Sequence, residues 1–297
     1  MTLTKLTLLS PAKLNLFLNI NGQLENGYHE LQSLFHFLNY GDEMTFIVSP
    51  SENKTGAVNL SCNIKTLESQ DNLIFKAADK LKQYASDTGL ASGLELSNIQ
   101  IELDKKLPMG GGVGGGSSNA ATTLLALNKL WNLNLSISTL EKIGLSIGAD
   151  VPIFVNGKTA IADGVGEKLT NYPIKEKWYL VLTPKQNVNT AELFSSPLLP
   201  RNSPKIPLDE IKYQGIESQF KNDFEKLVYN RYPNVAKSLD WLLEYGPARM
   251  TGTGACVFAE FDTQNEAKEV HNRLPVDLTG FVAKGCNTSP THQTLFG

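Results

Sequence analysis

A glycine cluster constrains this chain more than any other feature: six of the seven residues at 110–116 are glycine. Glycine loses more conformational entropy on folding than any other residue, so a simple connector would seldom use six of them. Because they lack side chains, their backbone N–H groups can approach a ligand closely and form an anion-binding concavity. The helix predicted to follow, from Ser118, would add the free N–H groups and positive dipole end of its first turn. The cluster therefore predicts a phosphate-binding loop.

Two better-known phosphate-binding motifs do not fit this loop. The motif GxxxxGK[ST] requires a lysine after its last glycine, where this chain has Ser117. The pattern GxGxxG fits Gly110, Gly112 and Gly115 only because nearly every residue is glycine, and no regular βαβ alternation surrounds it. A flexible linker is the structural alternative, but a linker need not lie between a strand and a well-formed helix.

Length and charge limit the class of protein. The 297 residues suffice for one large or two medium domains, and the formal net charge of −3 gives no global attraction for nucleic acid or an anionic membrane. Three widely spaced cysteines form no CxxC pair and no zinc-ligand spacing, which indicates reduced thiols. The start of the chain has no signal-peptide pattern, and no window approaches the roughly 20 apolar residues that cross a bilayer. We expect a soluble, cytoplasmic protein that binds neither nucleic acid nor membrane.

Hydrophobic periodicity predicts a mixed α+β fold without regular βαβ alternation. The expected strands are Leu6–Leu9, Leu14–Ile20, Met44–Val48, Ile99–Leu103, Val151–Val155, Thr159–Ala162, Trp178–Thr183, Ala255–Phe261 and Gly280–Lys284. The expected helices are Asn72–Tyr84, Ser118–Trp131, Thr139–Ile147 (capped by Ser138), Asn222–Tyr229, Val235–Glu244 and Asn265–Leu274. A turn is expected at Asn26-Gly27 and a loop over Ser195–Pro207. We place a domain boundary near residue 160, giving domains 1–160 and 161–297 with a cleft between them.

Three motifs, in order along the chain, resemble those of the GHMP kinase superfamily. They are Pro11-Ala12-Lys13-Leu14-Asn15-Leu16, the loop Pro108–Asn119, and Met250-Thr251-Gly252-Thr253-Gly254 with the strand that follows. The resemblance implies a two-domain GHMP kinase fold with the active site in the cleft between the domains. It also implies an enzyme that uses ATP and Mg²⁺ to phosphorylate an alcohol of a small molecule.

Further segments resemble one branch of that superfamily, the kinases of a cytidine diphosphate-linked methylerythritol in non-mevalonate isoprenoid biosynthesis. These segments are Gly27–Leu31, Asp71–Ile74, Gly148–Pro152, Thr190–Phe194 and Leu199–Asn202. The resemblance spans roughly residues 10 to 290, as for one whole enzyme. The branch implies transfer to the 2-hydroxyl of the acceptor. Val113 and Thr253 depart from the usual Leu and Ser, but both keep shape or hydroxyl chemistry.

The resemblance gives Asp150 the role of the carboxylate that accepts the proton of the acceptor hydroxyl. Phosphoryl transfer needs little more than such a base and a positioned nucleophile. Lys13 would lie beside Asp150, keep it ionised and stabilise the hydroxyl as it loses its proton. On the residues alone, a solvated Asp after a helix and an exposed Lys at a strand end are the commoner cases. Asn15 alternates onto the same face as Lys13 and would bind the acceptor.

An aromatic pocket for the cytosine ring is also implied by the resemblance. Tyr28 and Phe194 would stack on the base, His29 would meet its hydrogen-bonding edge, and Thr190 would lie nearby. Stacking of a base on an aromatic side chain contributes on the order of 1–3 kcal/mol. Core packing is the alternative; it is plausible for Phe194 and less so for Tyr28 and His29, which follow a turn and are expected to be exposed.

The nucleotide site is implied in the same way. Positions expected to line the adenine pocket or meet the triphosphate and its Mg²⁺ are Asn72, Leu73, Lys106, Pro108, Gly110, Gly111, Gly112, Gly114, Gly115, Gly116, Ser117, Ser118 and Asn119. Gly252 and Gly254 would bring backbone close to these loops. No pattern identifies a metal ligand.

Two alternatives differ in the chemistry they require. A homoserine or mevalonate kinase of the same superfamily would have a small acceptor with no base to stack, and so no use for Tyr28, His29 and Phe194. A nucleotide-binding regulator that kept the fold without catalysis would need neither Asp150 nor Lys13. The presence of all five residues favours the cytidylyl-acceptor kinase.

Overall fold

The computed structural model describes residues 4–49, 55–90, 96–213, 215 and 220–297. Residues 1–3, on which the expectation of no signal peptide partly rests, lie outside the described residues. The strands are β1 (Lys5–Gln23), β2 (His29–Val48), β3 (Val58–Cys62), β4 (Ile99–Asp104), β5 (Ala160–Asp163), β6 (Lys168–Asn171), β7 (Trp178–Leu182), β8 (Ala248–Met250), β9 (Val257–Phe261) and β10 (Gly280–Cys286). The helices are α1 (Leu73–Asp87), α2 (Gly115–Leu130), α3 (Ile137–Leu145), α4 (Val151–Asn156), α5 (Thr190–Ser195), α6 (Glu225–Arg231), α7 (Pro233–Leu243), α8 (Gln264–His271) and α9 (Pro290–Phe296), with a short 3₁₀ helix η1 (Lys65–Glu68).

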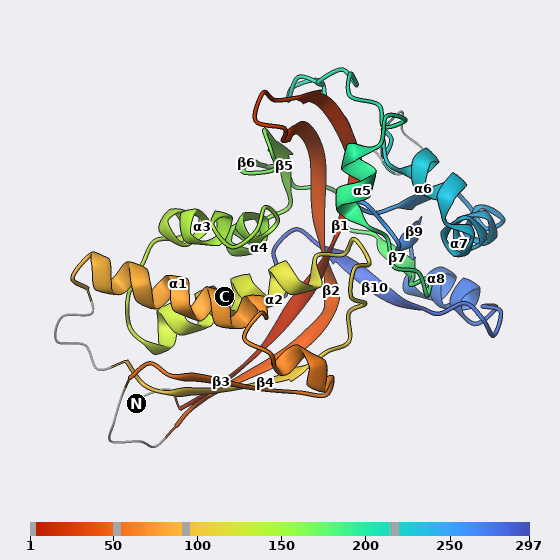
Figure 1. Ribbon diagram of the computed structural model, residues 1–297. Coiled ribbons are helices and arrows are strands. Elements are labelled where there is room, and N and C mark those ends of the chain that lie inside the picture. The colour runs from red at the N-terminus through yellow and green to blue at the C-terminus, as the bar shows by residue number, and fades with distance from the viewer. Residues whose placement is uncertain (1–3, 50–54, 91–95, 214, 216–219) are drawn as a thin grey trace.

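Two long antiparallel strands, β1 and β2, run through the whole molecule and pair from Lys5↔Ile47 to Gln23↔His29 (Figure 1). The turn between them contains the predicted Asn26-Gly27, and Gly27 has a φ of 85°. The register shifts between Pro11 and Lys13 and again between Asn15 and Phe17. Such irregularities bend a strand and re-aim its side chains, and these two flank the segment that carries Lys13 and Asn15.

The main path of the sheet runs β3-β4-β2-β10-β7-β9-β8, with β1, β5 and β6 paired off this path. Helices α1, α2, α3 and α4 pack on the half that contains β3 and β4, and α6, α7 and α8 lie around β7 to β10 (Figure 1). The predicted α+β class is confirmed, although β3, α1 and β4 do form one parallel βαβ unit. Because β2 pairs with both β4 and β10, the path is unbroken. The division into 1–160 and 161–297 stays a prediction.

Three buried apolar clusters hold these layers together. One joins α1, α2 and the N-terminal part of the sheet, with Leu81, Leu124 and Ile101 all fully buried. A second lies among α6, α7 and the C-terminal strands, and a third lies in the middle of the sheet around Phe17 and Phe258. Burial of an aliphatic or aromatic side chain contributes about 1.5–3 kcal/mol, so these clusters fix the strands that carry the polar residues between them.

The helices begin where local capping allows. Asn72 Oδ1 accepts the backbone N–H of Ile74 and starts α1, as the predicted helix from Asn72 requires. Helix α2 begins at Gly115, three residues before the predicted Ser118, so the last glycines of the loop form its first turn. Helix α3 was expected to be capped by Ser138, but Ser136 caps it, since its Oγ accepts the N–H of Thr139 at 3.1 Å.

The strand predicted over Val151–Val155 is wrong, because these residues form helix α4. A short apolar run fits a buried helix as well as a strand, and Pro152 suits the first turn of a helix. All five residues are buried, and Asp150 occupies the N-cap position without a side-chain cap bond. Helix α9, which the sequence did not predict, packs on α4 through His292 Nε2, 2.9 Å from the carbonyl oxygen of Val155.

Candidate active site

One large cavity, of about 1220 Å³, collects most of the predicted site residues. Its walls come from the β1–β2 hairpin, the start of α1, the glycine loop, the residues before α4, helix α5 and the turn at 251–254. Among the implied residues it is lined by Lys13, Asn15, Tyr28, His29, Asn72, Leu73, Pro108, Gly110, Gly111, Gly112, Gly114, Gly115, Gly116, Ser117, Asn119, Asp150, Thr190 and Phe194. Lys106 and Ser118 are not among the lining residues.

The glycine loop approaches the second glycine turn so closely that side chains would not fit. Gly112 has a φ of 75°, and a Cβ built on it would lie 2.3 Å from the carbonyl oxygen of Thr251. The loop then enters α2, whose first backbone N–H groups have no partner within the helix. These groups lie at the cavity wall, because Gly115 and Gly116 line it. The loop and the start of α2 therefore lie at the cavity wall, where free backbone N–H groups favour an anion, and the predicted phosphate-binding role stays a prediction.

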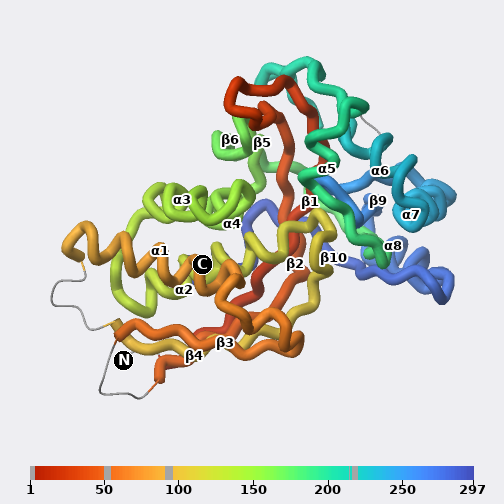
Figure 2. Tube along the Cα trace, viewed as in Figure 1, coloured from red at the N-terminus to blue at the C-terminus, as the bar shows by residue number. Residues whose placement is uncertain are grey.

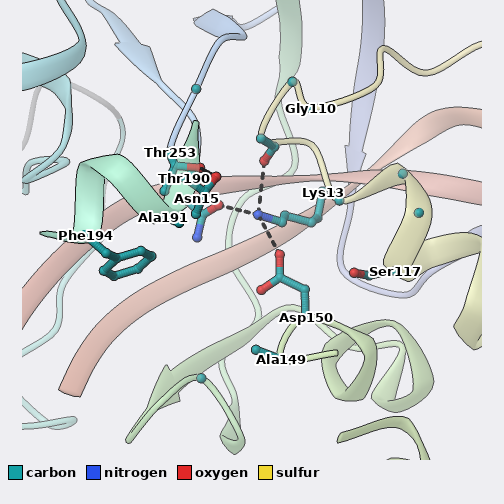
Figure 3. A pocket seen from close by; sticks show the side chains of 18 of the residues that line it. Lys13, Asn15, Gly110, Ser117, Ala149, Asp150, Thr190, Ala191, Phe194 and Thr253 are labelled. Atoms are coloured by element: carbon teal, nitrogen blue, oxygen red, sulfur yellow. Dashed lines mark hydrogen bonds and ion pairs between the residues drawn. The ribbon is translucent and has the colours of Figure 1, made fainter. Parts of the chain in front are cut away.

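Lys13 lies at the centre of the cavity, between the loop and Asp150 (Figure 3). Its ammonium contacts Asn15 Oδ1, donates to the carbonyl oxygen of Gly112 at 3.1 Å, and lies 3.4 Å from Asp150 Oδ2. The Phe35 ring centroid is 5.1 Å from Nζ. The side chain of Lys13 is 3% exposed, whereas that of Asp150 is 40% exposed. A buried cation thus faces an accessible carboxylate, which is the pair that the sequence implied.

Phe194 lies on one side of this pair and the start of α2 on the other. In Figure 3, Phe194 and Ser117 stand on opposite sides of Lys13 and Asp150. The Phe194 ring lies 5.0 Å from that of His29, tilted by 40°, and also packs edge-on to Phe224 at 4.9 Å. Phe194 therefore has both of the roles weighed from the sequence, since it lines the cavity and packs on a core residue.

Tyr28 and His29 differ in exposure, although both were expected to be exposed. Tyr28 is 65% exposed at the hairpin tip, but His29 is only 7% exposed. Burial lowers the pKa of His29, and the Arg201 guanidinium lowers it further. Thr190 Oγ1 lies 2.8 Å from Thr253 Oγ1, which ties α5 to the second glycine turn.

The glycine-loop end of the cavity has a support that the sequence did not reveal. Asp42 is completely buried and accepts hydrogen bonds from the backbone N–H groups of Lys106 and Leu107, from Asn119 Nδ2 and from the ammonium of Lys105. It therefore ties the strand before the glycine loop to the helix after it. Lys105, and not Lys106, lines the cavity there.

Lys106 and Ser118 are engaged elsewhere. The Lys106 ammonium lies 3.3 Å from Asp104 at the surface. Ser118 is completely buried, and its Oγ accepts the hydroxyl hydrogen of Ser10. Neither side chain lines the cavity.

Asn222 and Arg201 were also missed as site residues. Asn222 Nδ2 donates to the carbonyl oxygens of Met250 and Gly252, which holds the second glycine turn in place. Arg201 Nε donates to His29 Nε2 at 3.0 Å across 172 residues of sequence. A long-range pair of this kind leaves no periodicity or spacing in one sequence.

The described residues contain no group of three or more His, Cys, Asp or Glu side chains placed to hold a metal ion. Among the helices of these same residues, none is long and apolar enough to cross a membrane.

Comparison with known proteins identifies the family of this chain. Residues 72–158 match the model of the GHMP kinases N terminal domain, and residues 210–276 match that of the GHMP kinases C terminal domain. The 4-diphosphocytidyl-2-C-methyl-D-erythritol kinase of Shewanella loihica is 54% identical over 282 residues, covering 95% of this chain and 94% of its own. That of Haemophilus influenzae (strain 86-028NP) is 52% identical over 286 residues, covering 96% and 87%.

Solved structures agree in fold. A crystal structure of 4-(cytidine 5'-diphospho)-2C-methyl-D-erythritol kinase superposes with a TM-score of 0.77 at 25% identity, covering 94% of this chain and 99% of its own. The homoserine kinase of Cytophaga hutchinsonii has the same fold, with a TM-score of 0.63 at 16% identity, covering 98% and 97%. The predicted GHMP kinase fold is confirmed. This chain belongs to the GHMP kinases and, within them, to the family of the 4-diphosphocytidyl-2-C-methyl-D-erythritol kinases.

Proposed function

We propose that this protein transfers the γ-phosphoryl group of ATP to the 2-hydroxyl of 4-diphosphocytidyl-2-C-methyl-D-erythritol, giving the 2-phosphate and ADP for isoprenoid precursor biosynthesis. The observation that carries the proposal is one continuous cavity that contains the glycine loop, the Lys13–Asp150 pair and the aromatic residues. Ser117 at the start of α2 and Phe194 stand on opposite sides of Lys13 and Asp150 (Figure 3), His29 lies beside Phe194, and Tyr28 lines the same cavity.

ATP occupies the glycine-loop end in this proposal. Its triphosphate lies along the loop at 110–116 and the first turn of α2, where backbone N–H groups and the helix dipole favour negative charge. Asn72, Leu73 and Pro108 line the same cavity and would contact the adenosine. Both polar atoms of the Asn72 side chain already have backbone partners, so its contact with adenine is by packing. Lys106 and Ser118 do not line the cavity, so this proposal gives them no direct contact with ATP.

The cytidylyl acceptor occupies the aromatic end. Tyr28 and Phe194 supply ring faces for stacking on the base, which contributes about 1–3 kcal/mol per base. His29 lies beside Phe194 and lines the cavity, so it can meet the edge of the same base. Asn15 and Thr190 lie between the aromatic residues and Lys13 and are placed to bind the erythritol chain (Figure 3).

The chemistry follows from the middle of the cavity. The 2-oxygen of the acceptor forms a bond to the γ-phosphorus while the bond from that phosphorus to the oxygen of the leaving ADP breaks. Asp150 accepts the hydroxyl proton, a contribution that is typically 10²- to 10⁴-fold in rate. The Lys13 ammonium stabilises the negative charge of Asp150 and of the reacting oxygens during the transfer. Its contacts with Asn15, Gly112 and Asp150 hold it in place before any ligand binds.

A magnesium ion fits this site as a companion of ATP and not as a resident metal. With no cluster of carboxylates among the described residues, phosphate oxygens and water would supply most of its ligands, as Mg²⁺ usually requires. The Ser117 hydroxyl lines the cavity at the start of α2 and is placed to add one ligand. When bound, the ion would neutralise charge on the β- and γ-phosphates.

The test is ADP release by the purified protein with Mg-ATP and a panel of acceptors: the cytidylyl compound, mevalonate, homoserine and galactose. Turnover confined to the cytidylyl compound is expected. Turnover with another acceptor would retain the kinase and refute the cytosine pocket. Asp150→Asn should lose turnover while binding ATP normally, and a variant as active as the natural chain would remove Asp150 from the mechanism.

A further inference from the structure

Arg201 lies in the segment after α5, which passes beside the tip of the β1–β2 hairpin (Figures 1 and 2). Its guanidinium is held at four points. The Nε–H donates to His29 Nε2 at 3.0 Å, and the terminal nitrogens donate to the carbonyl oxygens of Leu199 at 3.1 Å, Phe194 at 2.7 Å and Ser196 at 2.9 Å. With three carbonyls fixing its plane, the Nε–H can aim only at the histidine.

This contact determines where His29 carries its proton. A guanidinium is always protonated and has donors only, so Nε2 of His29 must accept. A neutral imidazole has one N–H, which must then be on Nδ1. Burial and the Arg201 charge both lower the pKa of His29 below its ordinary value, so the ring is neutral at pH 7.

The Nδ1–H of His29 is free to meet a ligand. His29 lines the cavity, and no hydrogen-bond partner of its Nδ1 occurs among the described residues. Nor is Nδ1 among the buried side-chain atoms of those residues that lack a partner. The atom is therefore open to the cavity, next to the Phe194 ring on which a base would stack.

We propose that Arg201 is a positioning residue that fixes His29 as the Nδ1–H tautomer, and that the base pocket thereby selects cytosine over uracil. The inference rests on the proposed function and names the group that sets its base specificity. The ring nitrogen at position 3 is an acceptor in cytosine and a donor in uracil. A fixed Nδ1–H on His29 can hydrogen-bond to N3 of cytosine. Against uracil it would face the N3–H of the base, and both N–H groups would lack an acceptor.

The first experiment is ¹⁵N NMR of protein labelled in its four histidines, with the His29 signals assigned by their loss in His29→Gln. We expect protonated Nδ1 and unprotonated Nε2 for His29 in the unliganded protein. Arg201→Met should move His29 towards the Nε2-protonated form. A protonated Nε2 in the natural chain would overturn the inference, and this spectrum decides even if Arg201→Met does not fold.

The second experiment compares kcat/KM for the cytidylyl acceptor and its uridylyl analogue. Arg201→Met should lower the cytidylyl-to-uridylyl ratio by about tenfold or more, the effect of one hydrogen bond in a desolvated pocket. Arg231→Met is the matched control, because Arg231 also holds Ser196 and α5 but has no contact with His29. An unchanged ratio in Arg201→Met, or an equal fall in Arg231→Met, would overturn the inference.

The two experiments separate this inference from the proposed function. A natural chain that does not phosphorylate the cytidylyl compound refutes the proposed function and the base selection with it, whatever the spectrum shows. A cytidylyl-specific enzyme whose His29 carries its proton on Nε2 refutes the role of Arg201 alone.

Discussion

Replacing Lys13 by methionine should remove most of the turnover while both substrates still bind. The Lys13 ammonium lies 3.4 Å from Asp150 Oδ2 and its side chain is 3% exposed. Methionine has a similar unbranched shape and keeps the packing on Phe35, but it carries no charge. The substitution therefore tests the charge and not the volume of the side chain.

The size of the effect follows from that distance. Two unit charges 3.4 Å apart attract by about 5 kcal/mol at an effective dielectric constant of about 20. Because the Asp150 side chain is 40% exposed, water screens the field, and roughly half of that attraction, about 2–3 kcal/mol, remains effective. Negative charge moves from Asp150 to the reacting oxygens as the hydroxyl proton leaves, so the ammonium stabilises the transition state throughout. Since 1.36 kcal/mol is a factor of ten, kcat should fall by about 30- to 150-fold.

Steady-state ADP release at saturating Mg-ATP and cytidylyl acceptor measures this fall. The KM values for both substrates should stay within about threefold, because the loop N–H groups and aromatic rings that bind the substrates in this proposal do not include the Lys13 ammonium. Lys175→Met is the control, since this surface lysine also lies near a carboxylate, at 3.6 Å from Asp262 Oδ1, but is 80% exposed. A fall in kcat of less than tenfold, or a change confined to the acceptor KM, would refute the role given to the charge.

Three further outcomes are expected. Gly112→Ala should raise the KM for ATP by about tenfold or more, because a Cβ there would clash with the Thr251 carbonyl and backbone strain costs about 1–3 kcal/mol. Gly89→Ala is the control: Gly89 has a similar φ of 72° but open space around it, so that KM should not change. Equal KM values in the two variants would contradict the close approach of the glycine turns. Asp42→Ala should lower the free energy of unfolding in urea by about 3–5 kcal/mol, because it leaves a buried lysine ammonium without its carboxylate, and a loss no larger than that of the surface variant Asp104→Ala would count against this account. Burial lowers the pKa of His36 to about 4, so below about pH 6.5 the unfolded chain binds a proton at His36 that the folded chain does not. Between pH 7 and pH 5 the free energy of unfolding of the natural chain should therefore fall by about 2 kcal/mol more than that of His36→Gln. Equal falls in the two proteins would show that His36 does not titrate in this way.

The meeting of Lys13 and Asp150, the proposed catalytic pair, was predictable from the sequence, but their surroundings were not. Lys13, Asn15 and Asp150 were identified by motifs, and that identification does not depend on whether the surrounding residues form a helix or a strand. Asp150 was placed before a strand and in fact precedes helix α4, yet its carboxylate still faces Lys13. The error arose because five apolar residues in a row have no periodicity that separates a buried helix from a buried strand.

What the sequence could not show is the set of long-range polar pairs that hold the motifs. Asp42 bonds to a residue 64 positions away and Arg201 to one 172 positions away. Arg201 stands in the family-like segment Leu199–Asn202, but nothing in the sequence links it to His29. The first part of β2 was missed for a related reason. Gln32, Ser33 and His36 are completely buried there, so the strand lacks the alternation of polar and apolar residues that marks a half-exposed strand.

The β1–β2 hairpin explains why this family can require a long acceptor. The Lys13 ammonium lies over Phe35 of β2, and His29 begins the same strand six residues earlier. At about 3.3 Å per residue, the strand sets Phe35 and His29 about 20 Å apart, and with them the proposed phosphoryl-transfer centre and base pocket. Homoserine or mevalonate would reach only one end of that span, whereas a nucleoside diphosphate joined to a sugar alcohol can fill both. The bulges on either side of Lys13 and Asn15 re-aim this part of the strand, where the Lys13 ammonium lies 3.4 Å from Asp150 Oδ2, and the remainder of the hairpin sets the length of the molecule that can span both ends.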